Sequence, residues 1–122
     1  MTELLTRAEY GAIAAEIDLP ATPFVDGKFR KGSGPMMDTV NPATGEVLTS
    51  ISTANADDVD FAVQKAREAF DRGEWSRAHP SERKDVLIRL CKLITRRRHE
   101  LAVMESLDSG KPIKECEEFY MP

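Results

Sequence analysis

Apolar side chains recur at helical spacing in two stretches of the second half of the chain. The first stretch begins after Asn55 and ends at Gly73, and the second begins at Pro80 and ends near Asp108. Asn55 and Pro80 suit helix starts and Gly73 suits a helix end, so the pattern predicts two amphipathic helices, the second bent near Arg98. Such stripes normally pack into a core. Their apolar members are Val59, Ala62, Val63, Ala66 and Phe70, followed by Val86, Leu87, Leu90, Cys91, Ile94, Leu101, Met104 and Leu107.

Turn-forming residues divide the first half of the chain into shorter elements. Asp26-Gly27 between apolar residues predicts a tight hairpin, because this dipeptide accepts the positive φ angles of a two-residue turn. A proline and a glycine at residues 42–45 predict a second hairpin, with apolar and polar positions alternating from Val47 to Ile51. The predicted elements are hairpins at residues 24–30 and 37–52 and a flexible, glycine-rich connection at residues 31–35.

The first residues predict a short helical arm. Thr6 and Glu9 have the spacing of a capping box, so a helix is expected from Thr6 to Ile17. Pro20 and Pro23 then form a stiff connector. We therefore expect an arm and connector at residues 1–22 and a second part at residues 23–122, with hairpins within 24–52 and helices within 55–110.

Composition restricts the class of protein. The 122 residues are 41% hydrophobic and 31% charged with a net charge of −4, as in a soluble globular protein. The short basic cluster Arg96-Arg97-Arg98 is better explained by a nearby helix end than by nucleic acid binding. No apolar stretch approaches membrane length, and the first residues lack the apolar core of a signal peptide. We expect a cytoplasmic protein with no nucleic acid or membrane partner.

Cysteine and histidine residues form no cluster along the sequence. Cys91 lies on an apolar stripe, so we predict a buried and inert thiol. Cys116 lies among glutamates, which should raise its pKa and make it a poor nucleophile, although it is predicted to be the more accessible thiol. His79 and His99 have no second ligand at metal spacing and are predicted to lie at the surface.

Two motifs resemble a known enzyme family. The first reads TVNPATGEV at residues 39–47, where the Asn-Pro step is extended and the glycine reverses the chain. The second reads ESLDSGKP at residues 105–112, where a helix ends at glycine and proline prevents its continuation. Together with FVDGKF at 24–29, DDVD at 57–60, WS at 75–76 and PSER at 80–83, they resemble the N-terminal part of an NAD(P)-dependent aldehyde dehydrogenase, from about Phe24 to Ile113.

The resemblance implies an incomplete α/β enzyme. It implies an α+β fragment, with two small antiparallel hairpins followed by two or three helices of the cofactor-binding domain, whose parallel sheet comes later in the sequence. The family oxidises an aldehyde to a carboxylic acid with NAD or NADP through a cysteine nucleophile, a glutamate base and a Rossmann-like site. The chain contains neither a glycine-rich phosphate-binding motif nor a cysteine in the sequence context of the family nucleophile. No catalytic or cofactor-binding residue is therefore assigned, and neither NAD nor NADP is expected to bind the fragment.

The implied partners follow from what the fragment lacks. They are the remainder of the parent enzyme and, because the helices lose their sheet, a second copy of the chain, most simply in a two-fold dimer. Two other interpretations stay open. The chain could be an autonomous truncated interaction module with exposed apolar helices, or a small structural or regulatory protein with only pattern similarity. Within the family, the chain most resembles the branch acting on amino-aldehydes, such as γ-glutamyl-γ-aminobutyraldehyde or betaine aldehyde.

The resemblance also implies a structural cation site. Members of the family often bind sodium or potassium, and the motifs map the ligands to the backbone carbonyls of Thr39 and Val40 and the carboxylate of Asp108. A further ligand comes from outside this chain. Hard oxygen donors are the right class for such an ion.

Overall fold

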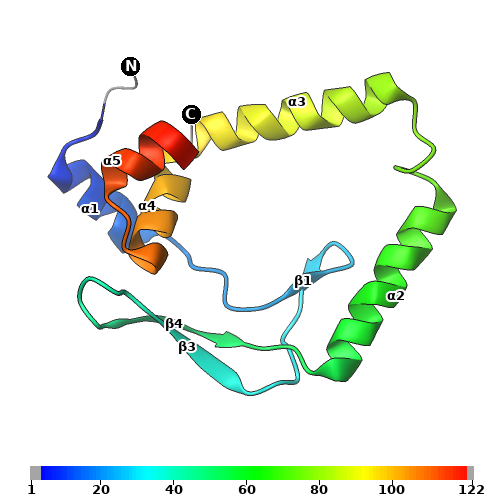
Figure 1. Ribbon diagram of the computed structural model, residues 1–122, viewed down its shortest axis with the longest axis horizontal. Coiled ribbons are helices and arrows are strands. Elements are labelled where there is room, and N and C mark those ends of the chain that lie inside the picture. Colours follow the sequence, from blue (N-terminus) through cyan, green and yellow to red (C-terminus); the bar gives the residue numbers. More distant parts are fainter. Residues whose placement is uncertain (1–3, 121–122) are drawn as a thin grey trace. The chain divides into compact units, whose positions relative to one another are not determined.

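Helices predominate in the chain, and two short antiparallel sheets lie in its N-terminal half. A computed structural model describes residues 4–120 (Figure 1). The sheets pair β1 with β2 and β3 with β4. The elements are α1 (Arg7–Glu16), β1 (Phe24–Val25), β2 (Lys28–Phe29), β3 (Met36–Val40), β4 (Val47–Ser52), α2 (Ala56–Arg72), α3 (Pro80–Arg96), α4 (Arg98–Ser109), α5 (Ile113–Glu115) and the π-helical turn η1 (Cys116–Tyr120). Both predicted hairpins and the predicted helices are confirmed, within a residue or two at each end.

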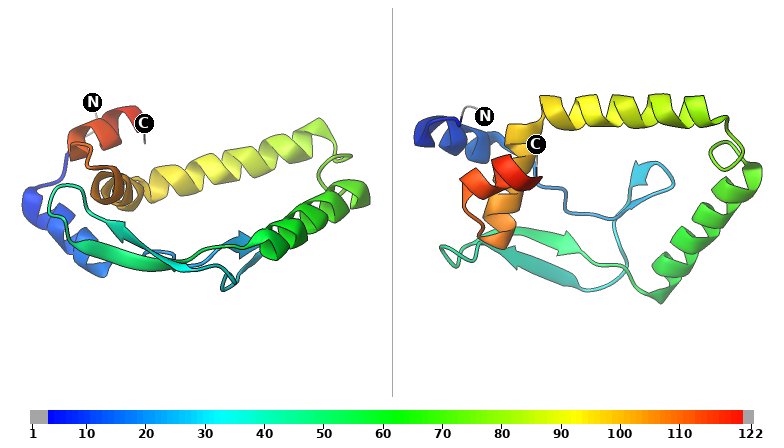
Figure 2. Two further views of the ribbon diagram at one scale, coloured as in Figure 1. Left: turned by 60° about the horizontal axis from the view of Figure 1, so that its bottom comes forward. Right: turned by 45° about the horizontal axis from the view of Figure 1, so that its top comes forward.

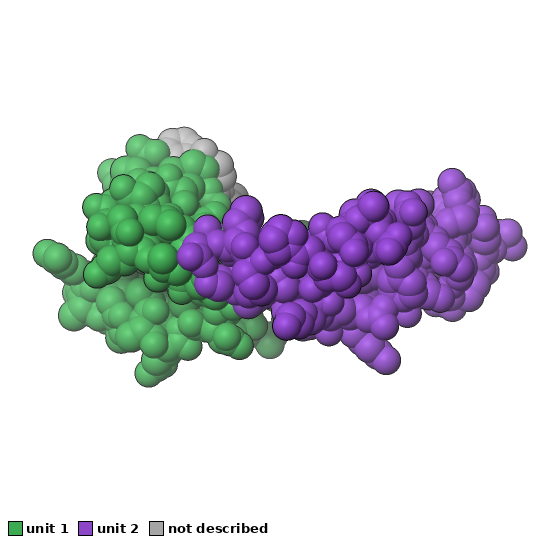
Figure 3. All heavy atoms as spheres, turned by 90° about the horizontal axis from the view of Figure 1, so that it is seen from below, with its two compact units in different colours: residues 1–19, 39–49, 89–122 green, residues 20–38, 50–88 purple. Residues whose placement is uncertain are grey.

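The chain forms two compact units (Figure 3). Unit 1 contains residues 1–19, 39–49 and 89–122, and unit 2 contains residues 20–38 and 50–88. Each unit therefore combines segments that are far apart in the sequence. The domain division expected at residue 22 stays a prediction.

Unit 1 is organised around α4. Helix α1 packs against α4, and so does η1, which continues directly from α5. In Figure 2 these are the blue helix, the orange helix and the red C-terminal helical segment. The α1 start is fixed by the predicted capping box, since the Thr6 hydroxyl accepts from the Glu9 amide and the Glu9 carboxylate accepts from the Thr6 amide. The core of the unit consists of Ala102, Val103 and Cys116, which are 0%, 4% and 0% exposed.

Helix α4 is separated from α3 by a single residue. Arg97 leaves the helical conformation with φ −107° and ψ 20°, so the bend expected near Arg98 is confirmed as a break. At its other end α4 stops at Gly110, which takes the left-handed conformation with φ 74°. Pro112 then caps the short helix α5, so the chain resumes helical structure after the proline in a new direction.

Unit 2 contains the tight hairpin and the whole of the first long helix, α2. Asp26 and Gly27 have φ angles of 55° and 73°, as a two-residue hairpin turn requires, and Phe24 stacks edge-on against Phe29 across the hairpin. Helix α2 begins with a capping box between Asn55 and Asp58 and ends at Gly73. Every helix cap that the sequence predicts at these positions is therefore present.

The glycine-rich connection at residues 31–35 is tied down rather than flexible. The Gly34 amide donates to the Thr53 carbonyl at 2.8 Å, and the Thr53 hydroxyl donates to the Pro35 carbonyl at 2.6 Å. A Cβ atom at Gly32 would lie 2.1 Å from the Thr53 carbonyl oxygen, so only glycine fits there. Ser33 donates to Asp58 through its amide, at 2.7 Å, and through its hydroxyl. The connection is thus hydrogen-bonded both to Thr53, which follows strand β4, and to Asp58 in the first turn of α2.

Burial corrects several expectations about side chains. The predicted order of the cysteines is wrong, because Cys91 is exposed and Cys116 is buried. No described element covers the face of α3 that carries Cys91, whereas Cys116 lies where η1 packs on α4. Val47 is also exposed, so the alternation in β4 is only partly reflected in burial.

Both apolar helix stripes are exposed. Neither α2 nor α3 has a buried residue. Val63 and Phe70 in α2 are 63% and 60% exposed, and Leu87 and Leu90 in α3 are exposed as well. The expectation that these stripes pack into a core within the chain is wrong, and the expectation that apolar surface stays exposed is confirmed.

Candidate functional site

The turn after β3 lies against the end of α4. In the turn, the Gly45 amide donates to the Asn41 carbonyl at 2.8 Å, and the Asn41 side chain accepts from the Ala43 amide. A Cβ atom at Gly110 would lie 2.8 Å from Cγ of Pro42, so glycine is needed here both for its left-handed conformation and for this close approach. The two motifs that carry the family resemblance therefore meet in unit 1.

In the sequence, Thr39 and Val40 of the expected cation site come shortly before Pro42, and Asp108 comes two positions before Gly110. Thr39 and Val40 end strand β3, and Thr39 donates its hydroxyl to the Thr49 carbonyl at 3.3 Å. Asp108 lies in the last turn of α4, where its exposed carboxylate has no hydrogen-bond or ion-pair partner among residues 4–120. Backbone carbonyls and a carboxylate are hard oxygen donors, the class of ligand expected for such a cation, and the site stays a prediction.

Side chains alone do not build a metal site in the described part of the chain. No group of three or more histidine, cysteine, aspartate or glutamate residues is placed to hold a metal ion within residues 4–120. The expected cation site differs from such a cluster because it uses backbone carbonyls and a single carboxylate. In the same residues, no helix is long and apolar enough to cross a bilayer.

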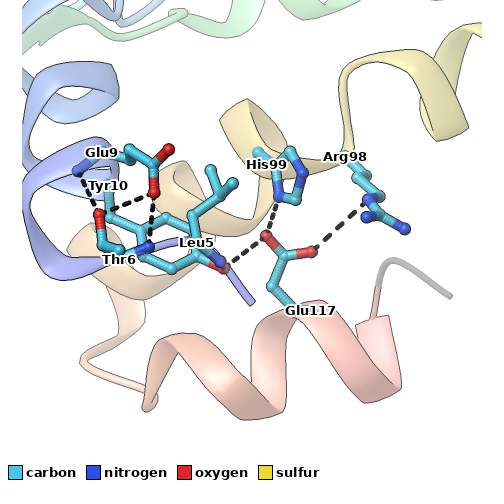
Figure 4. Close-up of polar contacts among 7 residues, drawn as sticks. All are labelled: Leu5, Thr6, Glu9, Tyr10, Arg98, His99 and Glu117. Carbon is cyan, nitrogen blue, oxygen red and sulfur yellow. Dashed lines mark hydrogen bonds and ion pairs between the residues drawn. The ribbon is translucent and has the colours of Figure 1, made fainter. Parts of the chain in front are cut away.

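A second polar centre lies inside unit 1 around Glu117. Its side chain is 0% exposed, and its Oε1 atom is hydrogen-bonded to the Tyr10 hydroxyl at 3.1 Å and to Nδ1 of His99 (Figure 4). Its other oxygen, Oε2, has no hydrogen bond, although Nε of Arg98 lies 4.0 Å away. Because a buried carboxylate costs free energy unless it is paired, these contacts determine whether η1 can stay packed.

Three elements of the fold meet at this carboxylate. Tyr10 comes from α1, Arg98 and His99 from the first turn of α4, and Glu117 from η1. The Tyr10 hydroxyl also accepts from the Leu5 amide at 3.3 Å. Partial burial is the main cause that raises the pKa of Tyr10, and the Glu117 carboxylate adds to it, so the hydroxyl keeps its proton and donates.

The sequence did not reveal this centre. His99 was expected to be an isolated surface residue, and that is wrong because it is partly buried against Glu117. Tyr10 and Glu117 are 107 positions apart, so no local spacing links them. The available signal was weak, because several acidic residues follow Pro112 and nothing in their spacing singles out Glu117.

Cys116 is held as a thiol beside the same segment. Burial is the first cause that raises its pKa, and the nearby Glu105 and Glu115 add to the effect. The prediction of a poor nucleophile is therefore confirmed, but burial contributes more than the neighbouring acids named from the sequence. Both cysteines are free thiols.

Comparisons with known proteins agree with the two motifs. Residues 29–121 match the aldehyde dehydrogenase family. The chain is 52% identical over 123 aligned residues to aminoacetaldehyde dehydrogenase of Pseudomonas aeruginosa, covering 100% of this chain and 25% of that protein.

Solved structures give the same result. The indole-3-acetaldehyde dehydrogenase of P. syringae, in complex with NAD+, superimposes with a TM-score of 0.92 at 35% identity, covering 98% of this chain and 24% of that one. The γ-glutamyl-γ-aminobutyraldehyde dehydrogenase of Burkholderia cenocepacia also reaches 0.92, at 37% identity, over 97% of this chain and 24% of that one. The chain thus spans about a quarter of the length of these relatives. It belongs to the aldehyde dehydrogenase family.

Proposed function

We propose that this chain is the N-terminal quarter of an enzyme that oxidises an aldehyde to a carboxylic acid with NAD(P). The chain supplies structure to the cofactor-binding domain and no catalytic group. The identity of 52% along the whole chain to an aminoacetaldehyde dehydrogenase is the observation that carries the proposal. The cytoplasm is the proposed location.

The exposed helix stripes support a structural role. In α2, Val59, Val63 and Phe70 are all exposed, although their spacing is that of a buried helix face. A soluble monomer rarely leaves such a stripe uncovered, because apolar patches of more than a few hundred Å² usually mark a contact surface. The remainder of the parent enzyme is the proposed partner for these stripes.

The proposed cofactor is NAD, and the proposed substrate class is amino-aldehydes. The cofactor is supported by relatives of this chain that bind NAD+ in their solved structures. The substrate class is supported by the identity to aminoacetaldehyde dehydrogenase and by the likeness to γ-glutamyl-γ-aminobutyraldehyde dehydrogenase. Structural similarity does not separate the substrates, because an indole-3-acetaldehyde dehydrogenase superimposes equally well. The 52% sequence identity to aminoacetaldehyde dehydrogenase is what favours the amino-aldehydes.

The proposed structural ion is sodium or potassium. The carbonyls of Thr39 and Val40 and the carboxylate of Asp108 would hold it, together with a ligand from outside this chain. The ion would neutralise a carboxylate placed at the negative end of α4. Thermal denaturation of the chimera described below, which contains the rest of an enzyme, tests the site without measuring activity. Its melting temperature in sodium or potassium chloride is compared with that in tetramethylammonium chloride. Asp108→Asn should abolish the difference, and Asp71→Asn on α2 is the matched control.

A chimera tests the main proposal. The corresponding quarter of the P. aeruginosa aminoacetaldehyde dehydrogenase is replaced by this chain, and NADH formation with aminoacetaldehyde is followed. We expect an active chimera, whereas the 122-residue chain alone should form no NADH. Val63→Asp on the exposed stripe should greatly reduce the yield of active enzyme, and Gln64→Asp on the polar side should not. An inactive chimera, or one indifferent to Val63→Asp, would contradict the proposal.

The alternative is an autonomous interaction module. The observation that favours it is the same exposure of α2 and α3, since a partner other than the parent enzyme could also cover these helices. The chimera separates the two functions. A module specialised for another partner should not restore an aldehyde dehydrogenase, whereas a genuine N-terminal quarter should.

A further inference from the structure

Helix α1 has little apolar contact to hold it in place. It is ten residues long and has no buried residue, and an isolated helix of that length is marginal in water. Its capping box satisfies the helix start but does not attach the helix to anything else. The docking of α1 on α4 must therefore depend on a few part-buried side chains, of which Tyr10 makes a polar contact with another element.

The segment after α4, unlike α1, contains fully buried side chains. It buries a carboxylate completely, at Glu117, and this cost is offset only while donors surround the carboxylate. One donor comes from α1 and the others from the start of α4. Because Oε2 has no hydrogen bond, the pair of contacts at Oε1 carries most of the compensation, and the loss of either contact leaves the carboxylate poorly paired.

We propose that Glu117 is a latch that fastens the N-terminal helix α1 to the segment at residues 113–118, so that the two dock on α4 and release from it together. The Tyr10 hydroxyl connects them directly, and His99 holds the shared oxygen from the α4 side (Figure 4). The latch assigns a role to the helical arm: it completes the pairing of a carboxylate 107 positions away. Opening at either end exposes the same buried charge, which is why the two ends are coupled.

Hydrogen exchange followed by mass spectrometry tests the latch in the 122-residue chain. Tyr10→Phe removes one hydroxyl and keeps the shape of the ring. We expect exchange to quicken by roughly tenfold or more, as for the loss of a hydrogen bond to a charged group, both in α1 and in residues 113–118. Glu117→Gln should change the same two segments. Glu118→Gln, at the exposed neighbouring acid, is the matched control and should change neither.

A double substitution measures the coupling. If the latch exists, Tyr10→Phe combined with Glu117→Gln should quicken exchange less than the product of the two single effects, since both remove one interaction. His99→Gln should also loosen both segments, and His79→Gln at the exposed histidine should loosen neither. Faster exchange confined to α1 would overturn the proposal, because the two segments would then be independent. Absence of protection in α1 of the unsubstituted chain would overturn it as well.

Discussion

Helices α2 and α4 have similar sequence patterns and opposite surroundings. Both carry apolar residues at helical spacing, and both end at a left-handed glycine. In α4, Ala102 and Val103 are buried by α1 and by the segment that follows Gly110. In α2, no residue is buried and the apolar stripe is exposed. The pattern of a helix thus identifies the face suited to burial, whereas burial itself requires a partner element.

The contrast also separates two ways of fixing a helix. Helix α2 is defined by its own ends, where Asn55 and Asp58 cap the start and Ser33 donates to the same carboxylate. Helix α4 is defined by its neighbours, with a start at Arg97 that lacks a side-chain cap. The Asn55–Asp58 capping box is a local feature of α2, whereas the start of α4 depends on tertiary packing. The capping box can be recognised in the sequence, whereas the packing around α4 cannot.

The largest expected effect comes from placing a charge on each helix. Val103→Asp in α4 should lower the free energy of unfolding by several kcal/mol, because an unpaired carboxylate would be buried. Val63→Asp in α2 should change it by no more than about 0.5 kcal/mol, because the side chain is exposed. Urea denaturation followed by circular dichroism measures both. Equal losses would mean that α2 is covered as α4 is.

A second test uses the stripe of α2 as a contact surface. The 122-residue chain should associate as its concentration rises, because its apolar stripes have no cover within residues 4–120. Sedimentation velocity over a range of concentrations measures this, and Val63→Asp with Phe70→Asp should shift the equilibrium towards the monomer. The matched control is the pair Gln64→Asp and Ala69→Asp, which adds the same two charges to exposed positions of the same helix outside the stripe. A monomer at all concentrations would show that exposure of the stripe has no consequence for association.

Thiol reactivity gives a third test. Cys91 should react with a maleimide or disulfide reagent first, because it is exposed, and Cys116 should react only on unfolding or opening. The raised pKa of Cys116, caused mainly by burial, reduces its thiolate further. Variants Cys91→Ser and Cys116→Ser, each with one thiol, should differ in native labelling rate by more than tenfold and label equally in denaturant. Faster labelling of Cys116 would contradict the packing of η1 on α4.

Much of the local structure was predictable because it depends on neighbouring residues. The capping boxes at Thr6 and Asn55, the hairpin turn at Asp26-Gly27 and the end at Gly110 each have a sequence signature with a physical cause. The two family motifs meet in space because a turn and a helix end approach each other at Gly110.

Burial was harder to predict, because it depends on whether another element covers a side chain and on contacts between residues far apart in the sequence. Cys91 follows the apolar period of α3, so its exposure could be known only from the lack of a covering element. Glu117 looks like one more surface acid until Tyr10 and His99 are placed beside it. The burial of this charge depends on its partners, and these come from two other elements, α1 and α4.

The smallest expected effect concerns the polar cap that defines α2. Hydrogen bonds from the Ser33 amide, and then from the Asn55 amide, lower the pKa of Asp58 below its ordinary value. A lowered folded-state pKa means that the carboxylate stabilises the fold above the unfolded pKa, and that this contribution is lost as pH falls through the lower, folded value. Acidification should therefore quicken hydrogen exchange at Ser33 beyond the intrinsic change. Asp58→Asn should remove this pH dependence, while Asp57→Asn, at an exposed acid without such hydrogen bonds, should keep it. If Ser33 exchange in the unsubstituted chain followed only the intrinsic pH dependence, the Asp58 cap would not be what ties the connection to α2.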